Sequence, residues 1–263
     1  MVPPTDKSGG PAENFMKRIF CLAFSTLLAA GTLSLAVAAQ HDVTTNPKEY
    51  FLKSSEVPDS LAILPPPPSE DSEQFKADIA RYKWGLEQRK TERGRQAFTD
   101  ADLNAKGVLE AFSEAYGMTI SEKATPWLFR LLQKMREDAG DLATRSAKEH
   151  YMRVRPFAYY KTDTCNTRQM KKLSTNGSYP SGHTAIGWAT ALVLAEINPD
   201  RQDQILKRGF EIGQSRVICG FHWQSDVDVG RTIAGFVNAR LHADPAFMQA
   251  LNKAKAEFAT EQK

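Results

Sequence analysis

The sequence has little cysteine and little excess charge, and each shortage excludes a class of protein. Three cysteines in 263 residues are too few for the small scaffolds that disulfide bonds hold together. Lysine and arginine number 34 and aspartate and glutamate 31, and the net charge of +3 is too balanced for a nucleic-acid binder with a basic face. With 41% hydrophobic and 25% charged residues, the chain is typical of a soluble globular protein and not of a disordered or polytopic membrane protein.

The long hydrophobic run of the chain lies near its N-terminus. Met16 is followed by Lys17 and Arg18, and then by a run that is apolar apart from small serine and threonine residues and ends in Ala-Val-Ala-Ala. We interpret residues 16–39 as a secretory signal peptide and residues 1–15 as an upstream extension. A permanent membrane anchor is the alternative, because the run is just long enough to span a bilayer. If the peptide is cleaved, we expect a soluble, exported protein of periplasmic location.

Export changes the interpretation of the cysteines. Cys21 leaves with the leader, and Cys165 and Cys219 remain as an even pair in an oxidising compartment. A disulfide between them is our prediction, and two free buried thiols are the alternative. A metal site formed by Cys219 and His222 is disfavoured, because no second Cys or His pair lies nearby to complete four ligands.

After the leader, the pattern becomes helical. Residues 40–68 show no helical periodicity, and their proline run at 65–68 favours an extended segment on the surface. From Ser69 onward, alternating patterns typical of strands are scarce, and apolar residues recur at three- and four-residue steps. We therefore predict that residues 69–263 form one all-α domain, a helical bundle. The first apolar stripe consists of Phe75, Ile79, Tyr82 and Leu86.

Several residues predict where helices begin and end. His183 opens a nearly all-apolar stretch, which is typical of a central buried helix. Asp244 and Pro245 are the cap and first residue of a last helix. Asp200 is a candidate cap for the helix that follows the apolar stretch. Pro156 is expected to stop the helix that precedes Pro156 itself in the chain.

Three segments carry polar residues that a helical core does not need: KEHYMRVRP at 148–156, GSYPSGHT at 177–184 and SRVICGFHWQSD at 215–226. The first holds two cations, Lys148 and Arg155, close together. Taken alone, this pair would be a solvated basic face.

The second segment places a proline and a glycine directly before the apolar helix. The N–H groups at the start of a helix have no internal partner and lie at its positive end, so Ser181 and Gly182 can form a cradle for phosphate. An ordinary helix start and a buried core histidine at His183 are the structural alternatives.

The third segment adds a cation, Arg216, and a histidine followed four residues later by a carboxylate, His222 and Asp226. This pair alone could be a structural hydrogen bond. Together with a second histidine, the cations and the cradle, it supplies the groups needed for phosphoryl transfer through a phosphohistidine.

The three segments resemble, in order and spacing, the signature of the superfamily containing phosphatidic acid phosphatases and vanadium haloperoxidases. GSYPSGHT at 177–184 is similar to the signature of its class A bacterial non-specific acid phosphatases, and the likeness extends from the proline run to about residue 259. The resemblance implies an all-α fold, a periplasmic homo-oligomer without metal or other cofactor, and hydrolysis of phosphate esters at acid pH. Neither a nucleic acid polymer nor a membrane is an expected partner of the mature form.

Chemistry and resemblance together assign the catalytic roles. We expect His222 to attack phosphorus, and Asp226 to hold the other ring nitrogen and stabilise the cation that forms. His183 is expected to protonate the leaving alcohol and then to deprotonate the attacking water.

The remaining site residues are expected to bind phosphate. Lys148, Arg155 and Arg216, with Ser181 and the N–H of Gly182, would hold the three equatorial oxygens and stabilise their charge in the transition state.

Three matters stay open from the sequence. Glu137 and Asp138 precede the first segment, and we interpret them as surface charges at a helix end rather than groups at the pocket mouth. A vanadium haloperoxidase or a phosphate-binding module without turnover is an alternative function, which the short chain and the second histidine disfavour. Phosphotransferase and nucleotide-hydrolysing activities also occur in the resembling class.

Overall fold

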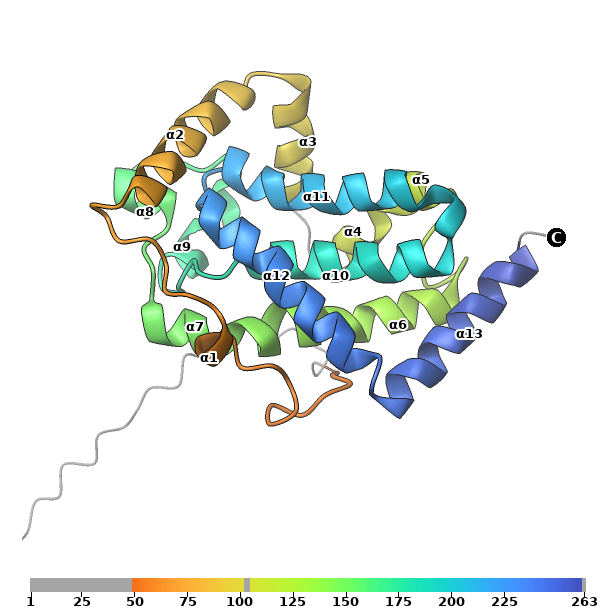
Figure 1. Cartoon of the computed structure of the whole chain (residues 1–263). Coiled ribbons are helices and arrows are strands. Elements are labelled where there is room, and N and C mark those ends of the chain that lie inside the picture. Colours follow the sequence, from red (N-terminus) through yellow and green to blue (C-terminus); the bar gives the residue numbers. More distant parts are fainter. Residues whose placement is uncertain (1–48, 102–104, 262–263) are drawn as a thin grey trace, which may run out of the picture. The chain divides into compact units, whose positions relative to one another are not determined.

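All regular structure in the described part of the chain is helical, which confirms the predicted all-α fold. The computed structural model describes residues 49–101 and 105–261 (Figure 1). The predicted leader at 16–39, the extension at 1–15 and Cys21 lie outside these residues. In chain order the elements are α1 (Ser60–Ile63), α2 (Glu73–Gln88), α3 (Glu92–Ala101), α4 (Ala105–Glu110), α5 (Ser113–Tyr116), α6 (Pro126–Glu137), the π-helix η1 (Asp138–Leu142), α7 (Ala143–Tyr151), α8 (Pro156–Tyr160), the 3-10 helix η2 (Thr167–Gln169), α9 (Met170–Leu173), α10 (Gly182–Ile197), the 3-10 helix η3 (Pro199–Arg201), α11 (Gln202–Ile218), α12 (Gln224–Leu241) and α13 (Pro245–Glu261).

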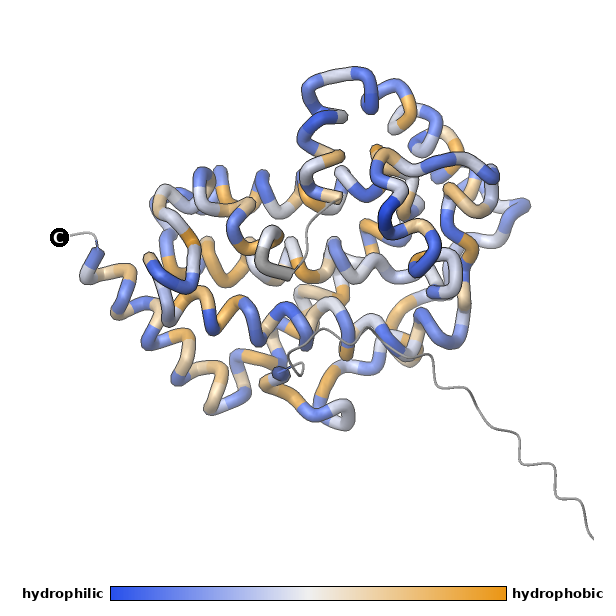
Figure 2. Tube along the Cα trace, turned by 180° about the vertical axis from the view of Figure 1, so that it is seen from behind, coloured by the Kyte–Doolittle hydropathy of each residue, from blue (hydrophilic) through white to orange (hydrophobic). Residues whose placement is uncertain are grey.

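Helix α10 is the central helix, as its apolar sequence predicts. It packs against α11, α12, α6 and η1, and Figure 1 shows α11 running beside it and α12 crossing it. Most other helices bury one face only, and along them hydrophobic and hydrophilic residues alternate (Figure 2). No helix within residues 49–101 and 105–261 has the length and apolar character required to cross a membrane.

The helices α10 and α11 approach closely because small residues face each other between them. A β carbon on Gly209 would lie 2.5 Å from that of Ala191, closer than two carbon atoms can pack. On the other side of the bundle, α13 packs against α6, and the Glu257 carboxylate accepts hydrogen bonds from Trp127 and Leu128 N–H at 3.0 Å. This contact satisfies donors that a helix start leaves unpaired.

The chain before α2 is fastened to the bundle by polar contacts. Asp138 is wholly buried and accepts hydrogen bonds from the N–H groups of Phe51 and Leu52, both at 3.0 Å. The prediction of a surface charge at Asp138 is therefore wrong. The carboxylate supplies hydrogen-bond acceptors for two N–H groups of a segment that is not helical. Glu137 is not fully exposed either; its side chain is 14% exposed and pairs with Arg136 at 2.8 Å.

Three local predictions differ from the structure. Pro156 begins α8 instead of ending α7, which stops at Tyr151 because Met152 turns into the left-handed region at φ 42°. Asp200 does not cap α11, since it lies inside η3. A short helix, α1, forms within the stretch expected to be extended, because Asp59 caps it through the N–H of Leu61. The predicted cap at Asp244 is confirmed, with a hydrogen bond of 2.8 Å from Phe247 N–H.

Candidate active site

The third segment folds into a tight turn between α11 and α12. The N–H groups of Phe221 and His222 donate to the carbonyl oxygen of Arg216, at 3.0 and 3.3 Å. The turn places His222 just before α12 and Asp226 in its first turn. Cys219 ends α11, and it forms a disulfide with Cys165. The structure thus joins the two cysteines as predicted, directly behind the turn.

The two ring nitrogens of His222 face groups of opposite charge. Nε2 lies 3.0 Å from Nη1 of Arg155, and Nδ1 lies 3.4 Å from Oδ2 of Asp226. A guanidinium can only donate hydrogen bonds, so Nε2 must be the acceptor and Nδ1 carries the proton. The lone pair of Nε2 is therefore directed at the cations of the site.

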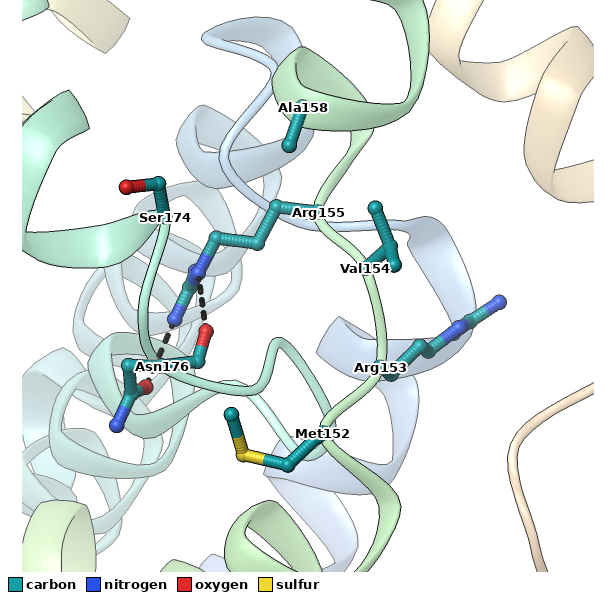
Figure 3. A pocket seen from close by; sticks show the side chains of 7 residues that line it. All are labelled: Met152, Arg153, Val154, Arg155, Ala158, Ser174 and Asn176. Carbon is teal, nitrogen blue, oxygen red and sulfur yellow. Dashed lines mark hydrogen bonds between the residues drawn. The ribbon is translucent and has the colours of Figure 1, made fainter. Parts of the chain in front are cut away.

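Arg155 is held in place by backbone carbonyls. Its guanidinium is buried and has other hydrogen-bond acceptors in addition to His222. These are the Asn176 side chain and the carbonyl oxygens of Leu173, Asn176, Gly177 and Phe221. Figure 3 shows Arg155 reaching toward Asn176 beside a cavity of about 70 Å³ that Met152, Val154 and Ala158 help to line. These contacts fix the planar donor group against the histidine.

The second segment forms the start of α10, where the sequence predicts a phosphate cradle. Ser181 caps α10, its N–H donates to the carbonyl oxygen of Asp226 at 2.9 Å, and its hydroxyl accepts from the Thr184 hydroxyl at 2.9 Å. The amide N–H groups of Gly182 and His183 have no acceptor among the residues that the structure describes. They are available to an anion at the positive end of the helix.

The other two predicted phosphate-binding cations are Lys148 and Arg216. Lys148 donates to the carbonyl oxygen of Pro180, one residue before Ser181. Arg216 is 1% exposed, and none of its three guanidinium nitrogens has a hydrogen-bond partner in the described part of the chain. Its guanidinium carbon lies 4.2 Å from the ring centre of Phe221. A buried guanidinium without partners can bind the oxygens of a phosphoryl group.

Burial and mutual repulsion lower the proton affinity of the whole cluster. Desolvation, followed by the charge of Arg155, lowers the pKa of Lys148 to about 7 and that of Arg216 to about 9. Desolvation also lowers the pKa of Arg155 to about 10. The pKa values of His183 and His222 are well below 6.5 because of desolvation and the nearby charges of Lys148, Arg155 and Arg216, although His222 is buried and His183 only half-buried. A bound anion would reverse this effect.

The structure brings all the predicted catalytic and phosphate-binding residues to one end of the bundle. They come from the end of α7, the loop before α8, the start of α10, the last turn of α11, the turn that follows it and the first turn of α12. Within the described residues, no group of three or more potential metal ligands is found.

Two further residues, Arg153 and Asp78, belong to this site and were not expected from the sequence. Arg153 donates to Asp226 Oδ1 at 2.5 Å and to Asp78 Oδ2 at 2.8 Å. Asp78 is 2% exposed on α2, where it lies on the same face as the stripe residues Phe75 and Tyr82. A carboxylate on an apolar stripe is the signal that could have identified it.

The chain is similar to known acid phosphatases over most of its length. Residues 139–246, which include all three segments, match the PAP2 superfamily. The chain is 58% identical to the non-specific acid phosphatase of Providencia stuartii, over 93% of this chain and 98% of that protein. It is 42% identical to the non-specific acid phosphatase of Salmonella typhimurium, over 79% and 83% of the two chains, and 34% identical to the acid phosphatase of Zymomonas mobilis, over 92% and 90%.

Proposed function

The chain belongs to the PAP2 superfamily as a class A non-specific acid phosphatase, and from this premise we propose that it works in the periplasm through a covalent phosphohistidine at His222. The observation that carries the proposal is the orientation of the His222 ring. Nε2 faces Arg155 at 3.0 Å, and Nδ1 faces the Asp226 carboxylate at 3.4 Å. A nucleophile needs an unprotonated nitrogen toward the phosphoryl site and an anion behind the ring. Nε2 carries no proton, its electron pair accepts a hydrogen bond from the phosphate-binding Arg155 in the ligand-free protein, and Asp226 lies behind the ring.

In the first half of the reaction, the Nε2 electron pair forms a bond to phosphorus while the bond from phosphorus to the alcohol oxygen breaks. The Nδ1 proton stays between the ring and Asp226, whose charge stabilises the imidazolium. His183 gives its proton to the leaving oxygen, so that a neutral alcohol departs. Lys148, Arg155 and Arg216 bind the equatorial oxygens throughout, because charge spreads over them in the transition state.

In the second half, a water molecule attacks phosphorus and His183 takes its proton. The bond between phosphorus and Nε2 breaks, and its electron pair returns to the ring. Inorganic phosphate leaves and both histidines are restored. The same intermediate can pass its phosphoryl group to an alcohol in place of water, which would give the phosphotransferase activity. With added alcohol, p-nitrophenol would then be released faster than phosphate, whereas equal rates would exclude transfer.

The charge of the site explains why this enzyme acts in acid. His183 must begin protonated, yet burial and three neighbouring cations hold its pKa well below 6.5 in the ligand-free protein. A bound phosphate ester brings negative charge among these cations and favours the protonated ring. Low pH and substrate therefore act together, and we expect a bell-shaped rate profile with its maximum at acid pH.

Trapping the intermediate tests the mechanism. Enzyme mixed with p-nitrophenyl [³²P]phosphate and quenched in base should carry label on His222, because phosphohistidine survives base and not acid. His222→Ala should lose both label and turnover, whereas Asp226→Asn should keep its KM within about threefold and lose kcat. Normal turnover by His222→Ala would contradict the covalent route.

The periplasmic location, the homo-oligomer and the independence of metal are separate proposals with separate tests. The leader at 16–39 and the disulfide between Cys165 and Cys219 support export to an oxidising compartment. Cell fractionation with N-terminal sequencing would show a periplasmic chain beginning after the leader, and an intact N-terminus in the membrane fraction would contradict this. Size-exclusion chromatography with light scattering would test the proposed homo-oligomer, and full activity in EDTA would support turnover without metal.

A further inference from the structure

We propose that Arg153 is a positioning residue for the nucleophile: by bridging the carboxylates of Asp226 and Asp78, it keeps the Asp226 carboxylate turned toward Nδ1 of His222. The inference rests on the proposed role of His222. It gives a role to Arg153 and Asp78, two residues behind the ring to which the three-segment signature assigns no function.

Both oxygens of Asp226 are committed. Oδ1 accepts from Arg153 Nη1 at 2.5 Å, and Oδ2 accepts from Trp223 N–H at 2.8 Å while facing His222 Nδ1 at 3.4 Å. The carboxylate has no solvent exposure. It cannot rotate away from the ring without breaking a charged hydrogen bond or leaving a buried N–H unpaired.

Arg153 is held from its other side by Asp78. Nη2 donates to Asp78 Oδ2 at 2.8 Å, and Asp78 also accepts from the N–H and hydroxyl of Ser225, at 2.8 and 2.6 Å. Nη1 of Arg153 lies 2.7 Å from the same hydroxyl. Helix α2 is thereby connected to the start of α12, one residue before Asp226.

Arg153 is the positive charge that pairs with both Asp226 and Asp78. Two buried carboxylates share one arginine whose side chain is 8% exposed. Without that cation, each buried carboxylate would lose a charged hydrogen bond, and Asp226 could turn away from the ring. A carboxylate that has turned away cannot stabilise the imidazolium that forms when Nε2 bonds to phosphorus, so the chemical step would slow.

Arg153 and Arg155 act on different nitrogen atoms of His222. Arg155 contacts Nε2 directly and belongs to the phosphate site, whereas Arg153 acts on Nδ1 through Asp226. Figure 3 shows the two side chains leaving the loop in different directions. Loss of Arg153 should therefore affect kcat, because the phosphate-binding cations stay in place.

A double-mutant cycle tests the proposal on the whole protein with p-nitrophenyl phosphate. Arg153→Gln should lower kcat at least tenfold and leave KM within about twofold. In the Asp226→Asn background, the same change should lower kcat less than threefold, since the group that it serves is already neutral. An equal loss of kcat in both backgrounds, or a loss confined to KM, would overturn the proposal.

Two further variants separate positioning from folding. Arg153→Lys keeps a charge but lacks the planar fork that reaches both carboxylates, so it should recover part of the lost kcat. Arg201→Gln is the matched control, because Arg201 donates to the backbone carbonyls of Ala115 and Glu114 at the opposite end of α10. It should lower the melting temperature and leave kcat unchanged.

If Arg153→Gln does not fold, the cycle is run with Asp78→Asn, which removes the other anchor. Its loss of kcat should be smaller and should also vanish in the Asp226→Asn background; a loss that persists there would overturn the proposal. The labelling experiment is independent of this result. An unlabelled wild-type enzyme would contradict the covalent mechanism, whereas a labelled enzyme without coupling would contradict the role of Arg153 alone.

Discussion

The carbonyl oxygen of Gly140 lies 2.7 Å from the place where a β carbon on Gly182 would be. Gly140 belongs to the π-helix η1 and Gly182 is the first residue of α10, so two backbones touch where the phosphate cradle begins. Real β carbons do not approach an oxygen this closely. The position of the free Gly182 and His183 N–H groups therefore depends on the missing side chain.

Gly182→Ala should displace the start of α10 and lower kcat/KM about a hundredfold, the cost of moving binding groups by about 1 Å. Steady-state kinetics with p-nitrophenyl phosphate would measure this loss. Gly235→Ala is the matched control, because nothing lies within 4 Å of its β carbon. It should leave activity unchanged and stabilise α12 by about 0.5–1 kcal/mol. Equal activity of both variants would show that the cradle tolerates movement.

The fold was predictable where a local pattern dominates. The apolar run from His183 predicts a buried helix, and α10 is one; Asp244 and Pro245 predict the start of α13. The end of α7 was not predictable, because Met152 adopts a left-handed conformation that its residue type does not favour. Pro156 is compatible with a helix start as well as with a helix stop.

In the candidate site too, local segments were predictable and long-range contacts were not. Its three segments are contiguous stretches with fixed spacing, so their residues could be identified together from the sequence. The pairing of Asp78 with Arg153 could not be predicted, because 75 positions separate them and only the tertiary fold brings α2 to the loop between α7 and α8. Asp138 was assigned to the surface because a helix end is usually exposed, and its burial depends on a distant segment at Phe51 and Leu52.

The disulfide should contribute substantially to stability. Cys165 and Cys219 close a loop of 54 residues, which corresponds to about 4 kcal/mol in the chain-entropy model. Cys165→Ser combined with Cys219→Ser should lower the free energy of unfolding by about this amount. Urea unfolding of both proteins would measure it, and reduction of the wild type should give a similar loss. An unchanged unfolding midpoint would mean that the two sulfur atoms are not joined.

Anion binding should weaken as the pH rises through 7. The pKa of Lys148 is lowered to about 7 by burial and then by Arg155 and Arg216, with Asp226 acting in the opposite direction, and a bound anion raises this pKa. The affinity that Lys148 contributes is therefore complete below pH 7 and is lost above it, by up to tenfold per pH unit. Sulfate is the suitable probe, because its charge does not change in this range.

Inhibition constants for sulfate between about pH 6.5 and 8.5 would test this prediction. Lys148→Met should bind sulfate more weakly at pH 6.5 and should lose the change near pH 7. The same pH dependence in this variant would assign the titration to another group.

The ligand-free protein should become less stable as the pH falls below about 6.5. His183 and His222 have pKa values well below 6.5 when folded, so the unfolded chain takes up protons first. Each histidine then removes at most about 1.4 kcal/mol for each pH unit, until its folded pKa is reached. Asp138 acts in the opposite direction between about pH 4 and 6, because burial raises its pKa to about 6, but this one stabilising group is opposed by two destabilising histidines.

The melting temperature of the ligand-free protein should therefore fall as the pH is lowered from 7.5 to 5, and sulfate should remove most of this dependence by favouring the protonated rings. His222→Asn should reduce the slope, because it removes one of the two rings with a lowered pKa. A melting temperature that is constant over this range without sulfate would mean that the buried rings are protonated together with the unfolded chain, and that the cations do not surround them as the structure indicates.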